Sequence, residues 1–469
     1  MKRVFRLLLV LAVALATVVG PLPASGDPVP EVKLRGVGIG PATLRSARIR
    51  PAAPLRVCSP GPATMVGLTW EQEGAEPVEA FLTWGGPRPG EARLVSDPEH
   101  APDPGPEAAG VREGTDPVWT GGARCVSLAL TVPEDVVLRD ARAVFVDTGA
   151  PSQETTGWLG PASASAAVPQ PEIVTRAGWG ADEDIKRCEP DLAESVRMAY
   201  VHHTAGSNAY SRAESDDIVR GIYAYHVEGR RFCDIAYNFL VDRFGTVYEG
   251  RSGGITEPVI GAHAQGFNTG STGIAAMGIF TRRAPSDALL RSLKGLLAWR
   301  LDVAHVEPMG TAEMTSAGGS NQKYEEGEVV MLPAVSGHRD TGYTTCPGDR
   351  LYAKLPGLRR GAQRMGLPKI WDVGASAEEV RFPDMPVQLT ADFSGLLEWT
   401  VTITDELGTP VRTDKGTSDF LAYEWNGTDT LGIPVAEGSY TITIAARDPA
   451  TDGDALPATL SVLVLAPEL

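Results

Sequence analysis

The sequence lacks any apolar run long enough to cross a membrane. Its longest such run extends from Leu7 to Val19, whereas a membrane-spanning helix needs about 20 apolar residues. Basic residues precede this run and small residues follow it, which is the pattern of a secretory signal peptide over residues 1–26. We therefore expect a secreted or cell-wall-associated protein with no stable membrane insertion after signal cleavage. Anchoring by an uncleaved signal is the alternative.

The sequence also lacks an excess of positive charge. It has 42 Lys and Arg residues against 59 Asp and Glu residues, for a formal net charge of -17. Proteins that bind nucleic acid usually neutralise phosphates with basic side chains. The charge balance therefore argues against nucleic acid as a partner, and we expect the function to depend on a local site.

Cysteine is scarce, and its number is odd. The chain has five cysteines, so pairing in an oxidising compartment leaves one over. Cys58 and Cys125 both fall in the N-terminal part of the chain, where a disulfide between them is the simplest interpretation. Two separate buried thiols are the alternative.

At 469 residues the chain is longer than a single hydrophobic core usually supports, which predicts two to four domains. Residues 27–148 alternate apolar and polar positions in short runs, as in an antiparallel β-rich domain. Residues 149–171 are rich in Pro, Ser and Ala and show no period, as in a linker. We expect further domains over residues 172–366 and 376–469.

The segment 172–366 alternates strand and helix patterns. We expect strands at residues 198–201, 237–241, 246–249 and 272–280. Ser211 and Glu214 form a capping-box pattern for one helix, and leucines from Leu289 to Leu301 mark a second. This alternation predicts an α/β domain with a mixed sheet flanked by helices.

After residue 368 the period-2 pattern returns, for example at Trp399, Val401 and Ile403. We expect a small β-sandwich over residues 376–469. Its strand and turn order, with Trp425-Asn426-Gly427 between two strands, resembles the Ig-like domain of flagellar hook-capping proteins. That resemblance implies a spacer or docking unit rather than a catalytic domain.

Histidine and cysteine gather in the α/β segment. Six of the seven histidines lie from His202 to His338, and Cys346 follows eight residues later. Two histidines and a thiolate can bind zinc and leave a fourth position to water, as in catalytic zinc sites. Metal coordination would also explain one cysteine outside the disulfides of an exported protein. His202 and His203 both remain candidates, because adjacent strand residues face opposite ways.

Five motifs follow one another in the α/β segment. They are Arg176–Ala181, Tyr200–Ala205, Asp234–Phe239, Gly261–Asn268, and Gly337–Asp340 together with Thr344–Gly348. Their order resembles that in peptidoglycan recognition proteins and the related type-2 N-acetylmuramoyl-L-alanine amidases of phages and bacteria. The likeness covers residues 170–366, less than half of the chain.

The resemblance implies roles for individual residues. It implies that Zn²⁺ is the cofactor and that Tyr237 is a catalytic residue. Thr344 stands where phage members carry a lysine, so that a neutral hydroxyl would hold the oxyanion. His226 and His305 are expected to be structural, and Cys188 and Cys233 are left to form a disulfide. The implied zinc ligands are His202, His338 and Cys346, and the implied substrate contacts are His263 and Asn268.

The implied activity is hydrolysis of the amide bond between N-acetylmuramic acid and L-alanine in bacterial peptidoglycan. Some members of the family lose the zinc cysteine and only bind peptidoglycan, so a non-catalytic recognition protein is the alternative. A structural wall protein with a vestigial central domain is a third hypothesis. The presence of His202, Tyr237, His338 and Cys346 together favours the enzyme.

Overall fold

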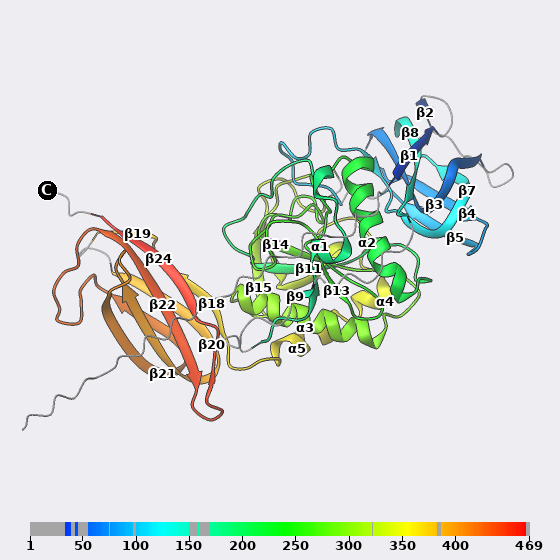
Figure 1. Cartoon of the computed structure of the whole chain (residues 1–469). Helices are drawn as coiled ribbons and strands as arrows, with labels where there is room; N and C mark the ends of the chain where they lie inside the picture. Colours follow the sequence, from blue (N-terminus) through cyan, green and yellow to red (C-terminus); the bar gives the residue numbers. More distant parts are fainter. Residues whose placement is uncertain are drawn as a thin grey trace, which may run out of the picture.

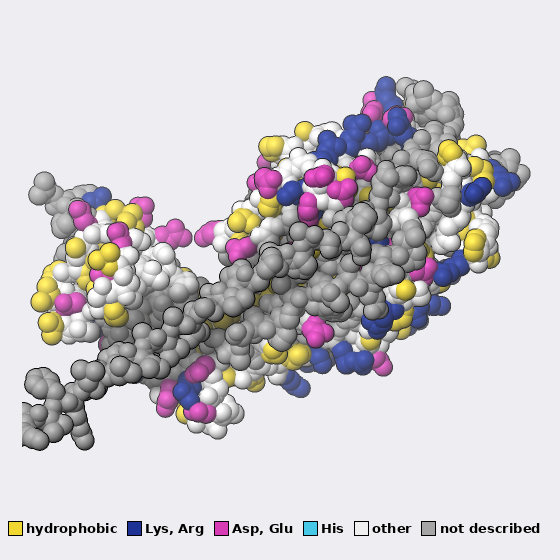
Figure 2. Space-filling view, in the orientation of Figure 1, with side chains coloured by type: hydrophobic (Ala, Val, Ile, Leu, Met, Phe, Trp, Pro, Cys, Tyr) yellow, Lys and Arg dark blue, Asp and Glu magenta, His cyan; other side chains and the backbone are white. Residues whose placement is uncertain are grey.

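The computed structural model describes residues 33–38, 43–45, 55–74, 76–96, 100–149, 158–159, 168–320, 322–381 and 386–465. The expected signal peptide and most of the expected linker lie outside these residues. Within the described ranges, no helix has the length and apolar character needed to cross a bilayer. Figure 1 shows a central α/β unit with one β-rich unit on either side. Acidic and basic side chains are interspersed on the face drawn in Figure 2.

The N-terminal unit is an antiparallel sheet, as its period-2 pattern predicts. Its strands follow the order β1-β8-β3-β7-β4-β5, with β2 beside β8 and β6 beside β3. Cys58 and Cys125 are register partners on β3 and β7 and form the predicted disulfide. The strands are β1 (Lys33–Gly38), β2 (Thr43–Arg45), β3 (Leu55–Glu73), β4 (Glu79–Trp84), β5 (Gly90–Val95), β6 (Glu113–Gly114), β7 (Val118–Thr131) and β8 (Val137–Asp147).

The central unit contains a mixed sheet of the order β17-β11-β14-β12-β13-β10-β9. Strand β11 runs parallel to both of its neighbours, whereas β12 and β13 are antiparallel. A separate two-stranded ribbon, β15 (Thr311–Thr315) with β16 (Val329–Pro333), was not predicted. The strands of the main sheet are β9 (Trp158–Leu159), β10 (Ile173–Val174), β11 (Met198–His203), β12 (Phe239–Val241), β13 (Val247–Glu249), β14 (Ser271–Ala276) and β17 (Val335–Gly337).

Helices cover both faces of this sheet. One core joins Val201 of β11 to leucines of α3 and α5, and a second core on the opposite face joins Leu240 to residues of α2. The predicted capping box is present, with the Ser211 N–H donating to the Glu214 carboxylate at 2.8 Å. The helices are α1 (Arg176–Trp179), α2 (Ser215–Ala224), which continues as the π-helical η3 (Tyr225–Gly229), α3 (Asp287–Val303), α4 (Asp349–Tyr352) and α5 (Leu355–Gln363). Short 3₁₀ turns are η1 (Glu183–Ile185), η2 (Arg212–Glu214) and η4 (His338–Asp340).

The N-terminal sheet packs directly against α2 and η3 (Figure 1). Met65 and Val146 belong to the same buried core as Ile222. A Cβ on Gly67 would lie 2.4 Å from the ring of Tyr225, so only glycine permits this approach. The sheet is therefore held close to the helix that covers one face of the central sheet.

The C-terminal unit is also β-rich. The long strand β20 pairs with β18 in its first half and with β22 in its second half, and a register shift separates Asp392 from Leu397. Trp425 is fully buried in its core. An Ig-like sandwich remains a prediction. The strands are β18 (Ile370–Ala375), β19 (Glu379–Val380), β20 (Val387–Thr404), β21 (Pro410–Trp425), β22 (Gly438–Asp448), β23 (Gly453–Asp454) and β24 (Ala458–Val464).

Candidate metal centre

The side chains of the two neighbouring histidines at the end of β11 point to opposite faces of the sheet. Alternation along the strand sends Val201 into the core with α3 and places His202 on the other face. The ring of His203 lies on the α3 side, where its Nδ1 accepts a hydrogen bond from the Phe280 N–H at 3.4 Å. Of the two, only His202 joins a group of side chains that could hold a metal ion.

His338 and Cys346 reach the same place from the end of β17, which pairs in parallel with β11. His338 begins the η4 turn directly after β17, and the next loop carries Cys346. The Cys346 Sγ lies 3.7 Å from the His202 Nδ1 and accepts a hydrogen bond from the His203 backbone N–H at 3.4 Å. Cys188 and Cys233 form the predicted second disulfide, so Cys346 belongs to neither bridge.

A fourth donor comes from the N-terminal unit and was missed by sequence reasoning. The His100 Nε2 lies 3.3 Å from the His202 Nδ1 and 3.2 Å from the His338 Nδ1. His100 is the one histidine outside the cluster from His202 to His338, and no motif surrounds it. Nothing in the sequence connects it to the site, because the contact depends on how two domains pack.

The four donors fit a zinc ion. Zinc bonds of about 2.0–2.1 Å to nitrogen and about 2.3 Å to sulfur place tetrahedral donors roughly 3.3–3.6 Å apart. The measured separations of 3.2, 3.3 and 3.7 Å match that spacing. The ligand atoms of His100, His202, His338 and Cys346 all lie within 4.8 Å of one another, and all four residues are buried. An imidazole and thiolate donor set of this size is typical of zinc.

Burial favours the neutral form of the His202 and His263 imidazoles. It lowers the pKa of His202 well below the usual value, and the neighbouring His338, His263 and His100 lower it further. Burial likewise lowers the pKa of His263. Neutral imidazole is the form that binds a metal ion.

His263 lies behind His202 and contacts it directly. Its Nδ1 is 3.1 Å from the His202 Nε2, on the opposite side of that ring from the other donors. A Cβ on Gly273 would lie 2.3 Å from the His263 ring, so the strand backbone fixes the ring closely. This arrangement suits a residue that orients a metal ligand. His263 is fully buried, and its expected role as a substrate contact stays a prediction.

Asn268 supports the loop that carries His263. Its Oδ1 accepts hydrogen bonds from the His263 N–H at 2.7 Å and the Ala264 N–H at 2.9 Å. Its Nδ2 donates to the Ala101 carbonyl at 3.0 Å and to the Asp103 carboxylate at 2.7 Å. The second predicted substrate residue is thus in contact with the N-terminal unit.

Tyr237 lies beside the four donors. Its ring centroid is 5.6 Å from that of His202 and 5.3 Å from that of His100. Thr344 is partly exposed, and its hydroxyl oxygen accepts a hydrogen bond from the Cys346 N–H at 2.9 Å. The hydroxyl therefore supports the loop of the thiol and retains its own proton for donation.

The two histidines expected to be structural have backbone contacts. The His226 Nδ1 accepts a hydrogen bond from the Ala236 N–H at 3.1 Å. The His305 Nδ1 lies 3.1 Å from the Ile370 carbonyl, between α3 and the C-terminal unit. Neither belongs to the four-residue cluster.

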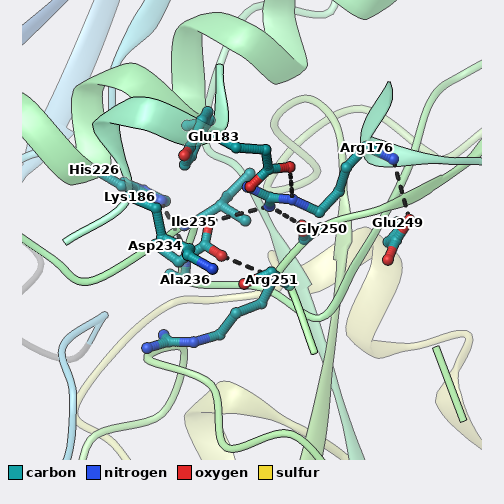
Figure 3. Close-up of polar contacts among 12 residues, drawn as sticks. Arg176, Glu183, Lys186, His226, Asp234, Ile235, Ala236, Glu249, Gly250 and Arg251 are labelled. Carbon is teal, nitrogen blue, oxygen red and sulfur yellow. Dashed lines mark hydrogen bonds and ion pairs between the residues drawn. The ribbon is translucent and has the colours of Figure 1, made fainter. Parts of the chain in front are cut away.

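An ionic network around the buried Arg176 and Asp234 fixes the segment before Tyr237 (Figure 3). The Arg176 guanidinium bonds the Glu183 carboxylate at 2.7 Å and the Asp234 carboxylate at 3.1 Å. Asp234 also accepts a hydrogen bond from the Ser252 N–H at 2.9 Å. Figure 3 shows the Arg251 side chain extending away from this network, and its guanidinium pairs with Glu107 of the N-terminal unit.

Residues 192–349 match the family model described as N-acetylmuramoyl-L-alanine amidase. Peptidoglycan recognition protein 1 of Bos taurus is 34% identical over 181 residues, which cover 38% of this chain and 80% of the bovine protein. Peptidoglycan-recognition protein SC2 of Drosophila melanogaster is 29% identical over 183 residues, covering 39% of this chain and 84% of that protein. The solved structure of Drosophila peptidoglycan recognition protein SD is 30% identical, with a TM-score of 0.30 and coverage of 39% of this chain and 90% of that one.

Proposed function

This chain belongs to the family of peptidoglycan recognition proteins and type-2 N-acetylmuramoyl-L-alanine amidases, and we propose that it is a zinc-dependent amidase. The reaction is hydrolysis of the amide bond between N-acetylmuramic acid and L-alanine in peptidoglycan. The observation that carries this proposal is the convergence of His202, His338 and Cys346 within ligand distance of one another. Two disulfides support a location outside the cell.

The proposed ligands are His202, His338 and Cys346, with His263 orienting the ring of His202. These residues would hold a zinc ion, which would supply a Lewis acid for hydrolysis of an amide. Burial excludes other water from the ligands and strengthens each electrostatic contact in the site.

We propose that the hydroxyls of Tyr237 and Thr344 donate hydrogen bonds to the oxygen of the scissile carbonyl. The ring centroid of Tyr237 lies 5.6 Å from that of His202, which supports a role for its hydroxyl as a donor to the substrate carbonyl. The Thr344 hydroxyl is held by the Cys346 N–H and has a proton to donate. Two neutral donors would stabilise the negative charge that develops in the transition state.

A specific observation favours a second candidate, a non-catalytic protein that binds peptidoglycan. His100 completes a set of four protein donors, and structural zinc sites have four protein ligands whereas catalytic sites keep one position open. Under this alternative the metal would hold the two domains together, and the chain would bind cell walls without cutting them.

The test is mass spectrometry of a soluble muropeptide and of purified cell walls after incubation with the zinc-loaded chain. The amidase predicts release of a stem peptide with a new L-alanine N-terminus. The His100→Ala variant is assayed in parallel, because His100 lies against the proposed ligands. Zinc-loaded proteins that bind walls yet release no stem peptide would contradict the enzyme and support the recognition protein.

A further inference from the structure

We propose that His100 is the fourth ligand of the metal and that residues 100–116, the inserted segment, close the active site of a latent enzyme. This inference rests on the proposed function of the central domain. It assigns the N-terminal unit a regulatory role, since an open ligand position is what a catalytic zinc site requires.

The orientation of His100 is that of a metal ligand. Its Nε2 faces the His202 and His338 Nδ1 atoms at 3.3 and 3.2 Å. Its other nitrogen, Nδ1, lies 3.6 Å from the Asp116 carboxylate at the end of the inserted segment. A carboxylate behind the ring of a histidine ligand fixes the ring orientation and raises its basicity. The ring is fully buried, so it does not reach this place as a mobile surface side chain.

Asp103 anchors the inserted segment to the loop that follows His263. One of its carboxylate oxygens accepts hydrogen bonds from the Gly266 N–H at 2.8 Å and from the Asn268 Nδ2 at 2.7 Å. The other accepts from the N–H and the hydroxyl of Thr269, each at 3.2 Å. Asn268 is one of the two residues that the sequence assigned to substrate, so Asp103 occupies a donor that a polar ligand could otherwise use.

Two arginines of the central domain hold the inserted segment at its start, its middle and near its end. Arg230 is fully buried and donates to the Arg112 carbonyl at 2.6 Å and to the His100 carbonyl at 3.2 Å. Arg251, also buried, pairs with Glu107. The segment is thus bonded at several points around the site rather than at His100 alone.

The base of the inserted segment is fixed by the interface between the two domains. A Cβ on Gly221 of α2 would lie 2.2 Å from the Met65 Sδ on β3, so the sheet and the helix are in close contact. The Tyr225 hydroxyl lies 2.8 Å from the carbonyl of Leu68 and 2.8 Å from that of Thr115. The closed arrangement is therefore built into the packing, and the segment must withdraw before substrate can reach the metal.

The test uses the full chain loaded with cobalt(II) in place of zinc, together with acetohydroxamate as a small metal-binding probe. The wild-type cobalt spectrum should not respond to the probe, because four protein donors occupy all the coordination positions of the ion. In His100→Ala the ligand-field bands should shift, and the probe should bind and shift them again. The zinc form of His100→Ala should hydrolyse a soluble muropeptide roughly 10- to 1000-fold faster than zinc-loaded wild type. This range applies if the open state of the wild type is a minor state populated at about 0.1–10%, and if the variant is mostly open.

Asp103→Ala is the second variant, since it loosens the segment and keeps every ligand. It should let the probe bind cobalt and raise hydrolysis above wild type. The matched control is Ala109→Ser, an exposed change on the same segment, which should behave as wild type. Circular dichroism verifies that each variant is folded.

The outcomes separate this inference from the amidase itself. A His100→Ala spectrum identical to wild type, or a wild-type site that already binds the probe, would overturn the assignment of His100. Equal hydrolysis by wild type and by both opened variants would overturn latency. A third outcome is that the probe binds cobalt in the two variants as expected, while no zinc-loaded form cleaves the muropeptide. That result would contradict the amidase and leave His100 as a ligand.

Discussion

His100 Nε2 lies 3.2 Å from His338 Nδ1, although 238 residues separate them in the sequence. The contact joins the N-terminal sheet domain to the end of β17 in the central domain. A metal held by both residues would bind only the assembled pair of domains. Metal binding and domain packing should therefore stabilise one another.

Cys346→Ser should lose most of its bound zinc and its activity. The thiolate is the one sulfur donor of the cluster, and a serine hydroxyl remains protonated and binds zinc weakly. Zinc content is measured by atomic absorption after dialysis, and hydrolysis is measured on a soluble muropeptide. Tyr343→Phe, an exposed change on the same loop, is the control and should keep both. A fully active Cys346→Ser protein with stoichiometric zinc would remove Cys346 from the ligand set.

His263→Leu should weaken zinc binding by about 10- to 100-fold, which is the usual cost of losing a partner behind a metal ligand. The variant removes the group 3.1 Å from the His202 Nε2, so the His202 ring loses its fixed orientation. Competition with a chromogenic chelator gives the affinity. His263→Gln, which retains a polar group, should recover part of it. Unchanged affinity in His263→Leu would instead place His263 outside the support of the metal.

Thr344→Val should lower turnover by roughly a hundred to a thousand fold, or about 2.7–4 kcal/mol, if its hydroxyl donates to the oxyanion. Substrate affinity should stay nearly constant, because the donor acts on charge that develops in the transition state. Thr344→Ser retains the hydroxyl and should remain active.

Zinc content separates the two roles of Thr344. Its oxygen also accepts the Cys346 N–H at 2.9 Å, so a variant that merely loosens this loop would lose zinc. Loss of zinc from Thr344→Val in proportion to its lost turnover would assign Thr344 to loop support and leave Tyr237 as the proposed donor.

Asp302 should make stability depend on pH. Burial raises its pKa to about 6 from 3.8, and Lys369 at 3.8 Å opposes this shift. Between these values the folded chain holds a proton that the unfolded chain has released. The contribution of Asp302 to the free energy of unfolding is therefore full below pH 3.8 and is lost as pH rises to about 6.

Asp302→Asn removes this titration. Relative to wild type, its stability should rise with pH across the window, by at most about 1.4 kcal/mol per pH unit. Urea unfolding of both proteins at a series of pH values from about 4 to about 7 measures the difference. Parallel curves for the two proteins would show that Asp302 titrates alike in the folded and unfolded chains.

Much of the architecture follows from local sequence. The period-2 pattern predicts the two β-rich units, and the leucine spacing predicts α3, because burial on one face imposes its own repeat on a strand or helix. Ser211 and Glu214 mark the start of the helical segment that contains α2. Their capping-box contacts join residues only three positions apart, so the local sequence is enough to predict them. The number of cysteines and the expected oxidising compartment likewise predicted both disulfides.

Tertiary structure decided which way each side chain of the site faces. His202 and His203 are equivalent in sequence, and only the packing of one sheet face against α3 sends the His203 ring away from the donors. The contact between His263 Nδ1 and His202 Nε2 also depends on tertiary packing, because 61 residues separate the two histidines in the chain.

The role of His100 was the least accessible to sequence. Its neighbours in the chain carry no metal-site motif, and its three partners come from another domain. The sequence determined that a histidine and cysteine cluster with zinc-binding chemistry exists in the central domain. Only the packing of the N-terminal sheet against α2, through contacts such as that of Met65 with Gly221, places His100 beside this cluster. Such contacts leave no periodic or local signal in the sequence.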